Sequence, residues 1–112
     1  MTKILFVCSA NVDRSPTAER IYKNKPGMEV KSAGVSLYAT TPISAELIQW
    51  ADVVLCMSKW QKMEIEKRFV IENTVIDYLD IEDDYSYMER KLVEIITKKV
   101  DAWLKINDSM IQ

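Results

Sequence analysis

The sequence predicts a single α/β domain: a three-layer fold in which a four-stranded parallel sheet has helices on both faces. Short apolar runs rich in β-branched residues alternate with segments of helical periodicity, which is typical of a parallel sheet. The chain has 112 residues, 48% of them hydrophobic, enough for one core. No repeat, linker or low-complexity stretch divides it. We therefore expect residues 1–112 to form one domain.

The first half of the chain predicts two strands and two helices. Residues 3–7 are apolar and predict a buried strand. Ser15 followed by Pro16 is typical of a helix start, with serine as the cap and proline as the first residue. Residues 28–32 predict a short second strand after a Pro-Gly turn. Thr41 followed by Pro42 predicts a second helix in the same way.

The second half predicts two more strands and two more helices. Residues 53–57 and 75–79 form β-rich apolar runs, and Ser58 is expected to cap a helix through Phe69. Ser86 and Glu89 match a capping box, which predicts the start of the last helix. Apolar residues recur at helical spacing along that helix: Met88, Leu92, Ile95, Ile96, Val100 and Trp103.

Composition excludes several classes of function. The formal net charge is −2 and the calculated pI about 5.2, so no basic surface for nucleic acid is expected. Histidine is absent, which disfavours zinc or haem binding, and we expect no metal and no cofactor. Residues 4–7 are too short for a signal peptide, and no segment reaches the length of a membrane span. Two cysteines then predict free thiols in the cytoplasm.

The most informative stretch lies where the first strand gives way to the first helix. Cys8 ends the strand, and Arg14 follows at the start of the helix, in the sequence VCSANVDRSP. A helix N-terminus and a nearby arginine are the surroundings that lower the pKa of a cysteine thiol and make it nucleophilic. An arginine fork can also grip two phosphate oxygens, and successive loop amides can bind the others. The spacing predicts a site that binds phosphate and attacks phosphorus.

Four ordered blocks of the sequence resemble the low-molecular-weight protein tyrosine phosphatases. The family signature, cysteine, five residues, arginine, serine and proline, reads CSANVDRSP here. Ser32-Ala33-Gly34 is similar to the family's Ser-Ala-Gly, and ADVVLCMSK to its third strand. Residues 80–85, DIEDDY, resemble its acid loop. The resemblance covers nearly the whole chain and is closest to the short members of the family. It implies the strand order 2-1-3-4.

The resemblance assigns roles to residues of the first loop. It implies that Cys8 is the nucleophile and that Arg14 stabilises the transferring phosphoryl group. Asn11 would hydrogen-bond Ser32 and stiffen the loop, although an asparagine also suits a left-handed turn by itself. Besides capping the helix, Ser15 would hydrogen-bond the cysteine sulfur. The phosphate-binding loop would comprise Ser9, Ala10, Asn11, Val12, Asp13, Arg14 and Ser15.

The acidic run that follows the fourth strand is, taken alone, typical of a solvated loop. Its resemblance to the family's acid loop selects Asp83 as the general acid, with Asp84 as the alternative. Tyr85 would line the substrate pocket and Tyr38 could form its opposite wall, although each could instead be structural. Cys56 lies in an apolar strand, where inert packing is expected.

Departures from the family pattern concern the two loops. Ala10 replaces a frequent glycine, which a loop accepts if φ at that residue is negative. Asp13 stands where many members have a second cysteine that can form a protective disulfide. Glu82 and Asp84 replace the two prolines of the acid loop, so this loop is more acidic and less rigid. The segments near residues 35–45 and 70–80 are shorter than in typical members.

The function that follows is a metal-free phosphomonoesterase, most simply a protein tyrosine phosphatase that forms a phosphocysteine. Its expected partners are a phosphorylated protein or a small aryl or metabolite phosphate, with no nucleic acid and no membrane. Three alternatives stay open: an arsenate reductase, which needs further cysteines; a non-catalytic module that binds phosphate or phosphoprotein; and a phosphatase for metabolites or phosphoarginine. The sequence does not determine the oligomeric state.

Overall fold

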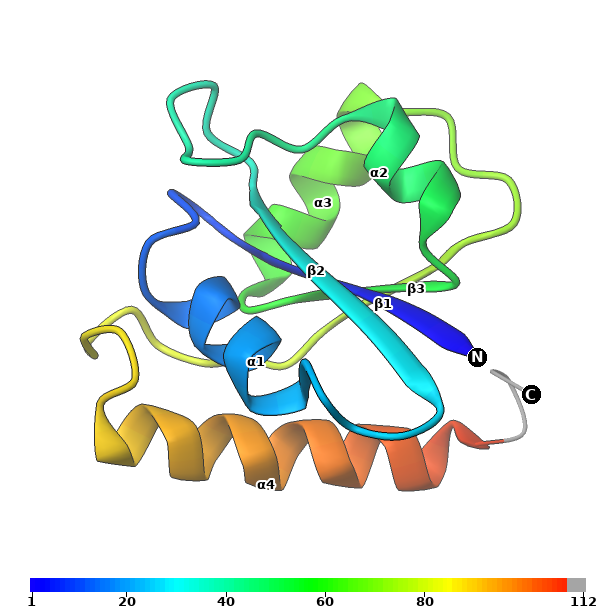
Figure 1. The fold of residues 1–112 in the computed structure, drawn as a ribbon. Helices are drawn as coiled ribbons and strands as arrows, with labels where there is room; N and C mark the ends of the chain where they lie inside the picture. The colour runs from blue at the N-terminus through cyan, green and yellow to red at the C-terminus, as the bar shows by residue number, and fades with distance from the viewer. Residues whose placement is uncertain (109–112) are drawn as a thin grey trace.

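The central sheet contains four parallel strands in the order β2-β1-β3-β4 (Figure 1). The computed structural model describes residues 1–108. The strands are β1 (Thr2–Cys8), β2 (Met28–Gly34), β3 (Val53–Cys56) and β4 (Val75–Tyr78). The predicted fold class and the strand order implied by the family resemblance are both confirmed.

Four helices cover the sheet. They are α1 (Arg14–Tyr22), α2 (Ala45–Trp50), α3 (Lys59–Arg68) and α4 (Arg90–Ile106). Figure 1 shows α1 and α4 together on one side of the sheet and α2 and α3 on the other. The fold therefore has the expected three layers. Within residues 1–108, no helix combines the length and hydrophobicity that a bilayer crossing requires.

The core lies on both faces of β1, whose alternate side chains point to opposite sides. Ile4, Phe6 and Cys8 belong to the cluster under α1 and α4. Leu5 and Val7 belong to the cluster under α2 and α3. Burial of both faces explains why β1 is continuously apolar rather than alternating. Its carboxyl end, at Cys8, is consequently held in a well-packed strand.

Three of the expected helix starts are wrong. Ser15 lies inside the first turn of α1, and the residue at the cap position is Asp13. Pro42 precedes α2 and pairs with Gly34 in an isolated bridge, while Ser44 caps α2 by accepting a hydrogen bond from the N–H of Leu47. In both cases a contact with β2 lies where the spacing predicted a cap: Ser15 donates to the carbonyl oxygen of Ala33, and the carbonyl oxygen of Thr41 accepts from the N–H of Gly34.

The last helix also begins later than predicted. Ser86 does donate its N–H to a Glu89 carboxylate oxygen at 3.1 Å, as in a capping box. Met88 then adopts a φ of 58°, which interrupts the helix, and α4 starts at Arg90. The predicted apolar face of α4 is otherwise confirmed, with Leu92, Ile96, Val100 and Trp103 buried.

Candidate active site

Cys8 and Arg14 mark the two ends of a loop that joins the carboxyl end of β1 to the first turn of α1. The Cys8 side chain is almost fully buried, and its sulfur lies 2.9 Å from Oγ of Ser15. The expected contact between Ser15 and the cysteine sulfur is thus present. A hydroxyl at that distance can donate to a thiolate, which is the charged form that a nucleophilic cysteine must adopt.

The backbone of this loop is fixed by the segment after β2. The carbonyl oxygens of Cys8, Ser9 and Ala10 accept hydrogen bonds from the N–H groups of residues 35, 36 and 40, at 3.0 to 3.1 Å. Since a trans peptide holds its carbonyl and N–H on opposite sides, the next amide in each case faces the other way. The N–H groups of residues 9, 10 and 11 therefore point away from the segment after β2.

Gly34 explains why the Ser-Ala-Gly block ends in glycine. A Cβ atom at this position would lie 2.6 Å from the carbonyl oxygen of Ser9 and 2.7 Å from Cβ of Ala39. Any larger residue would therefore push the phosphate-binding loop away from β2. Each residue of the block contacts that loop, because Ala33 also accepts a hydrogen bond from Ser15 through its carbonyl oxygen.

Asn11 holds the inside of the loop. Its φ is 57°, in the left-handed region that asparagine tolerates, and its Nδ2 donates to Ser15 at 2.9 Å and to Ser32 at 3.0 Å. Ser32 donates in turn to a carboxylate oxygen of Glu19 at 2.5 Å. Both sequence-based interpretations of Asn11, turn former and loop support, are therefore compatible with its geometry. Ala10 has no positive φ, so it fits where relatives have glycine.

Arg14 is buried, with 3% of its surface exposed, and hydrogen bonds to two other segments of the chain fix the orientation of its side chain. Its Nη1 donates to Oγ of Ser58 at 2.9 Å and to the carbonyl oxygen of Ile81 at 2.8 Å. Nε lies 3.5 Å from Oδ1 of Asp83, the charge that faces the guanidinium. Nη2 makes a longer hydrogen bond, 3.4 Å, to Oγ of Ser9. The edge formed by Nε and Nη2 therefore faces Asp83 and Ser9, and a planar guanidinium edge of this kind can bind two oxygen atoms of a ligand.

A cavity of about 60 Å³ lies between the loop and Asp83. It is lined by Cys8, Ser9, Ala10, Val12, Asp13, Arg14 and Asp83. The structure thus brings the three expected catalytic side chains, Cys8, Arg14 and Asp83, to one cavity, which has room for a phosphate group and little more.

Asp83 is the residue of the acid loop that reaches the cavity. Its side chain is 67% exposed, and Ile81 two residues earlier is anchored by hydrogen bonds to Arg14 and to the carbonyl of Met57. Asp84 is exposed and does not line the cavity. Asp80 has a φ of 57° and accepts a hydrogen bond from Lys99 through its carbonyl, which turns the chain at the start of the loop.

The two expected aromatic walls lie elsewhere. Tyr85 is partly buried and packs against the core cluster under α1 and α4, and Tyr38 is 95% exposed in the loop after β2. Neither lines the 60 Å³ cavity. Tyr87 is closer to the phosphate-binding loop, because its N–H donates to Oδ1 of Asp13 at 2.9 Å. The family pattern pointed to Tyr85, and no signal in the sequence marked the contact that Tyr87 makes with Asp13.

Gln61 is a supporting residue that the sequence analysis missed. It is fully buried at the start of α3, where it accepts a hydrogen bond from the N–H of Ser58 at 2.9 Å. Its Nε2 donates to Oγ of Ser9 at 3.2 Å. A glutamine three residues after Ser58 matches a helix-capping pattern, which signals the cap and not the contact with the loop.

Cys56 faces away from the site. It is fully buried in the cluster under α2 and α3, whereas Cys8 belongs to the cluster on the opposite face of the sheet. Burial raises the pKa of the Cys56 thiol far above its ordinary value. Both features agree with the expected role in packing.

Comparison with known proteins assigns the chain to a family. The model for low molecular weight phosphotyrosine protein phosphatase matches residues 3–41. The protein is 30% identical to the low molecular weight protein-tyrosine-phosphatase PtpB of Staphylococcus aureus, over 95% of this chain and 97% of that protein. The chain belongs to the low molecular weight protein-tyrosine-phosphatase family.

Other relatives are named as phosphatases of arginine rather than of tyrosine. A protein-arginine-phosphatase of Geobacillus stearothermophilus is 35% identical over 60% of this chain, and the match spans 62% of that protein. The structure of the YwlE arginine phosphatase from the same organism superposes with a TM-score of 0.71 at 25% identity, covering 97% of each chain. The phosphatase fold is thus shared with members named for two kinds of phosphorylated residue.

Proposed function

We propose that the protein is a metal-free phosphomonoester hydrolase that acts on phosphotyrosine through a phosphocysteine intermediate. The observation that carries this proposal is the convergence of Cys8, Arg14 and Asp83 on one cavity of phosphate size, within a member of a phosphatase family. A thiol nucleophile, a cation and a carboxylic acid are the three groups that such a reaction needs.

In the first step the Cys8 thiolate attacks phosphorus in line with the bond to the leaving oxygen. The S–P bond forms as the P–O bond breaks, and the electron pair of that bond goes to the leaving oxygen. Arg14 and the loop amides hold the three equatorial oxygens, whose charge they stabilise in the transition state. The carbonyls of Cys8, Ser9 and Ala10 are already bonded to the segment after β2, which supports this orientation of the loop.

Asp83 would give its proton to the departing oxygen. In the second step water attacks phosphorus while Asp83 accepts a proton, the S–P bond breaks, and its electron pair returns to sulfur as thiolate. Ser15, 2.9 Å from the sulfur, would turn its one hydroxyl proton from the carbonyl oxygen of Ala33 to that thiolate as it leaves. The ion pair between Asp83 and Arg14 keeps the acid at the rim of the cavity before substrate binds.

Arsenate reduction fits the structure less well. A thiol-based reductase needs a second cysteine that can reach the first, and the one other cysteine in the sequence is Cys56. Its side chain lies on the opposite face of the sheet from that of Cys8, and a disulfide requires Cβ atoms about 3.5–4.5 Å apart with suitable direction.

Phosphoarginine is the second candidate substrate, because relatives that match this chain are named as arginine phosphatases. The same nucleophile and cation would serve, with a guanidinium nitrogen in place of the phenolic oxygen. The expected partners are then phosphorylated proteins in both cases, or small phosphate esters that enter the same cavity.

A substrate panel tests the proposal. Nitrophenyl phosphate and peptides with phosphotyrosine, phosphoserine and phosphoarginine would be given to the wild type, to Cys8→Ser and to Cys56→Ser. We expect turnover of the aryl esters by the wild type, no turnover by Cys8→Ser with vanadate binding retained, and rates within about threefold of wild type for Cys56→Ser. Retained turnover in Cys8→Ser would exclude the covalent mechanism. Phosphate binding without any turnover would indicate a binding module.

A further inference from the structure

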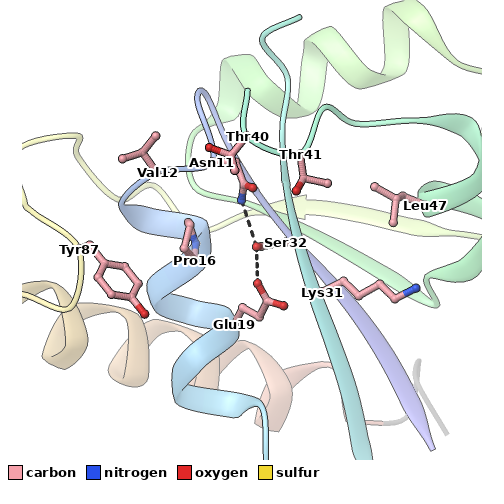
Figure 2. A pocket seen from close by; sticks show the side chains of 10 residues that line it. All are labelled: Asn11, Val12, Pro16, Glu19, Lys31, Ser32, Thr40, Thr41, Leu47 and Tyr87. Atoms are coloured by element: carbon pink, nitrogen blue, oxygen red, sulfur yellow. Dashed lines mark hydrogen bonds between the residues drawn. The ribbon is translucent and has the colours of Figure 1, made fainter. Parts of the chain in front are cut away.

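A larger groove runs beside the phosphate-binding loop. Its volume is about 660 Å³, and it lies between α1, the end of β2 and the segment before α2 (Figure 2). Its lining residues are Asn11, Val12, Pro16, Glu19, Lys31, Ser32, Thr40, Thr41, Leu47 and Tyr87. A volume of this size can hold several side chains of a ligand, in contrast to the 60 Å³ phosphate cavity.

The groove adjoins the phosphate cavity. Val12 lines both hollows and is 55% exposed, so it forms the ridge between them. Tyr87, which is 45% exposed, lies at the same end of the groove as Val12 and Pro16 (Figure 2). A phosphorylated residue bound over Cys8 would therefore place its neighbouring residues against Val12 and into the groove.

Glu19 supplies the negative charge among the residues that line the groove. Its carboxylate accepts the Ser32 hydroxyl, and among residues 1–108 it takes part in none of the ion pairs. Lys31 extends away from it (Figure 2), with Nζ 4.5 Å above the ring of Trp50. Arg20 and Lys23 line a second hollow together with Pro16, Glu19 and Tyr87, and they do not line the groove itself. The groove thus presents a carboxylate that forms no ion pair with any lysine or arginine of residues 1–108.

We propose that this groove binds the polypeptide on one side of the phosphorylated residue and that Glu19 selects a lysine or arginine side chain there. The inference rests on the proposed function, because it names the class of phosphoprotein that the same site would take. The exposed apolar surface of Val12 and Tyr87 would contact the stem of the basic side chain, and the Glu19 carboxylate its charged end.

Paired peptides test the selection. Each phosphotyrosine peptide would carry either lysine or glutamate at one position, scanned over three residues on both sides of the phosphotyrosine. We expect the wild type to favour lysine by about threefold to tenfold in kcat/KM at one or two positions on the same side, because one partly exposed ion pair replaces a repulsion. Added salt should reduce the preference.

Three variants locate the source of the preference. Glu19→Gln keeps an acceptor for the Ser32 hydroxyl but removes the charge, and Thr41→Lys adds an ammonium at an exposed position of the groove. The ratio of lysine to glutamate peptide should fall toward one in both. Since the ratio compares two substrates of one variant, a general loss of catalysis cancels. Gln49→Lys adds the same charge in a different hollow, on α2, and should keep the wild-type ratio.

Binding of the same peptides to Cys8→Ser separates the two proposals. If nitrophenyl phosphate is not hydrolysed but Cys8→Ser binds the lysine peptides more tightly, the proposed hydrolase activity is wrong and the groove assignment stands. Equal kcat/KM and equal Kd for lysine and glutamate peptides at every position would overturn the groove assignment. So would a lysine preference that survives both Glu19→Gln and Thr41→Lys.

Discussion

The backbone N–H of Tyr87 donates a 2.9 Å hydrogen bond to Oδ1 of Asp13, across 74 positions of sequence. Asp13 occupies the cap position of α1, where an aspartate normally accepts hydrogen bonds from its own helix. Its side chain makes no such cap and is directed to the segment after the acid loop. Next to it, the N–H of Met88 donates to Oγ1 of Thr17 at 2.9 Å. These two contacts tie the end of the acid loop to the phosphate-binding loop.

Loss of the Asp13 contact should loosen the acid loop. We expect Asp13→Ala to lower kcat/KM on phosphotyrosine peptide by about fivefold, as expected for one net hydrogen bond, and to lower it less on nitrophenyl phosphate. Asp13→Asn keeps the acceptor oxygen and should stay closer to wild type. Steady-state kinetics on both substrates measures the difference. Equal losses in Asp13→Ala and Asp13→Asn would show that the carboxylate charge, and not the contact with Tyr87, is what matters.

The position of the two cysteines predicts irreversible oxidation. Asp13 offers no thiol beside Cys8, and Cys56 lies on the other face of the sheet. A sulfenic acid at Cys8 therefore has no resolving partner and should proceed to sulfinic acid. Peroxide should abolish activity, with two oxygen atoms added to the Cys8 peptide in the mass spectrum and little recovery in dithiothreitol.

Asp13→Cys is the matched variant for this oxidation. It restores the cysteine that many relatives carry at this position, and a larger fraction of its activity should return in dithiothreitol. A reversible disulfide between Cys8 and Cys56 in the wild type would contradict the prediction and would favour the reductase alternative.

The geometry of the acid loop predicts that Asp83, and not Asp84, protonates the leaving group. A phenolate needs that proton most when it is basic, so the loss in Asp83→Asn should depend on the substrate. We expect a fall of about 10²–10⁴-fold on phosphotyrosine and a smaller one on nitrophenyl phosphate. The limb of the pH–rate profile on which activity falls as the acid loses its proton should also disappear.

Asp84→Asn and Asp80→Asn are the controls for the acid. Both should change the two substrates by similar factors, since they alter the loop and not the proton transfer. A loss in Asp84→Asn that depends on the leaving group, without one in Asp83→Asn, would mean that the acid is Asp84. The assignments of Cys8 and Arg14 do not depend on this result.

Burial of Cys56 predicts a loss of folding stability at alkaline pH. Because the pKa of the Cys56 thiol is raised in the folded state, the unfolded chain releases this proton first, above about pH 8.5. The free energy of unfolding should then fall as the pH rises, by about 1.4 kcal/mol per pH unit for this group. Cys56→Val, which has no thiol proton, should show a shallower fall in urea titrations between pH 8 and 10. Parallel curves for the two proteins would contradict this expectation.

Much of the fold and of the phosphate site is local in the sequence. Cys8 and Arg14 lie six positions apart along one loop, so the end of β1 and the start of α1 already bring the two residues close together. The alternation of apolar runs and helical segments predicted the layers for a similar reason. The spacing of apolar residues within one segment indicates whether it is a strand or a helix and which of its surfaces is buried. The strand order required the family resemblance, because periodicity does not distinguish one parallel arrangement from another.

Capping and loop contacts were the points where local reasoning failed. Ser15 and Pro42 have the spacing of helix starts, yet each makes a contact with β2 that the spacing does not encode. Ser86 makes the expected contact with Glu89, but the positive φ of Met88 delays the start of α4 to Arg90. Tyr38 and Tyr85 were expected to line the substrate pocket on the family pattern, and neither is among the residues that line the phosphate cavity.

The sequence by itself determined the nucleophile, the cation and the short loop that joins them, because strand, turn and helix propensities act over a few neighbouring residues. Only the tertiary structure decided which carboxylate faces Arg14, which tyrosine contacts Asp13, and that a groove with the Glu19 carboxylate adjoins the phosphate cavity. These relationships join residues up to 74 positions apart. They arise from how α1, β2 and the acid loop pack together, and packing between distant segments leaves no periodic pattern in the chain.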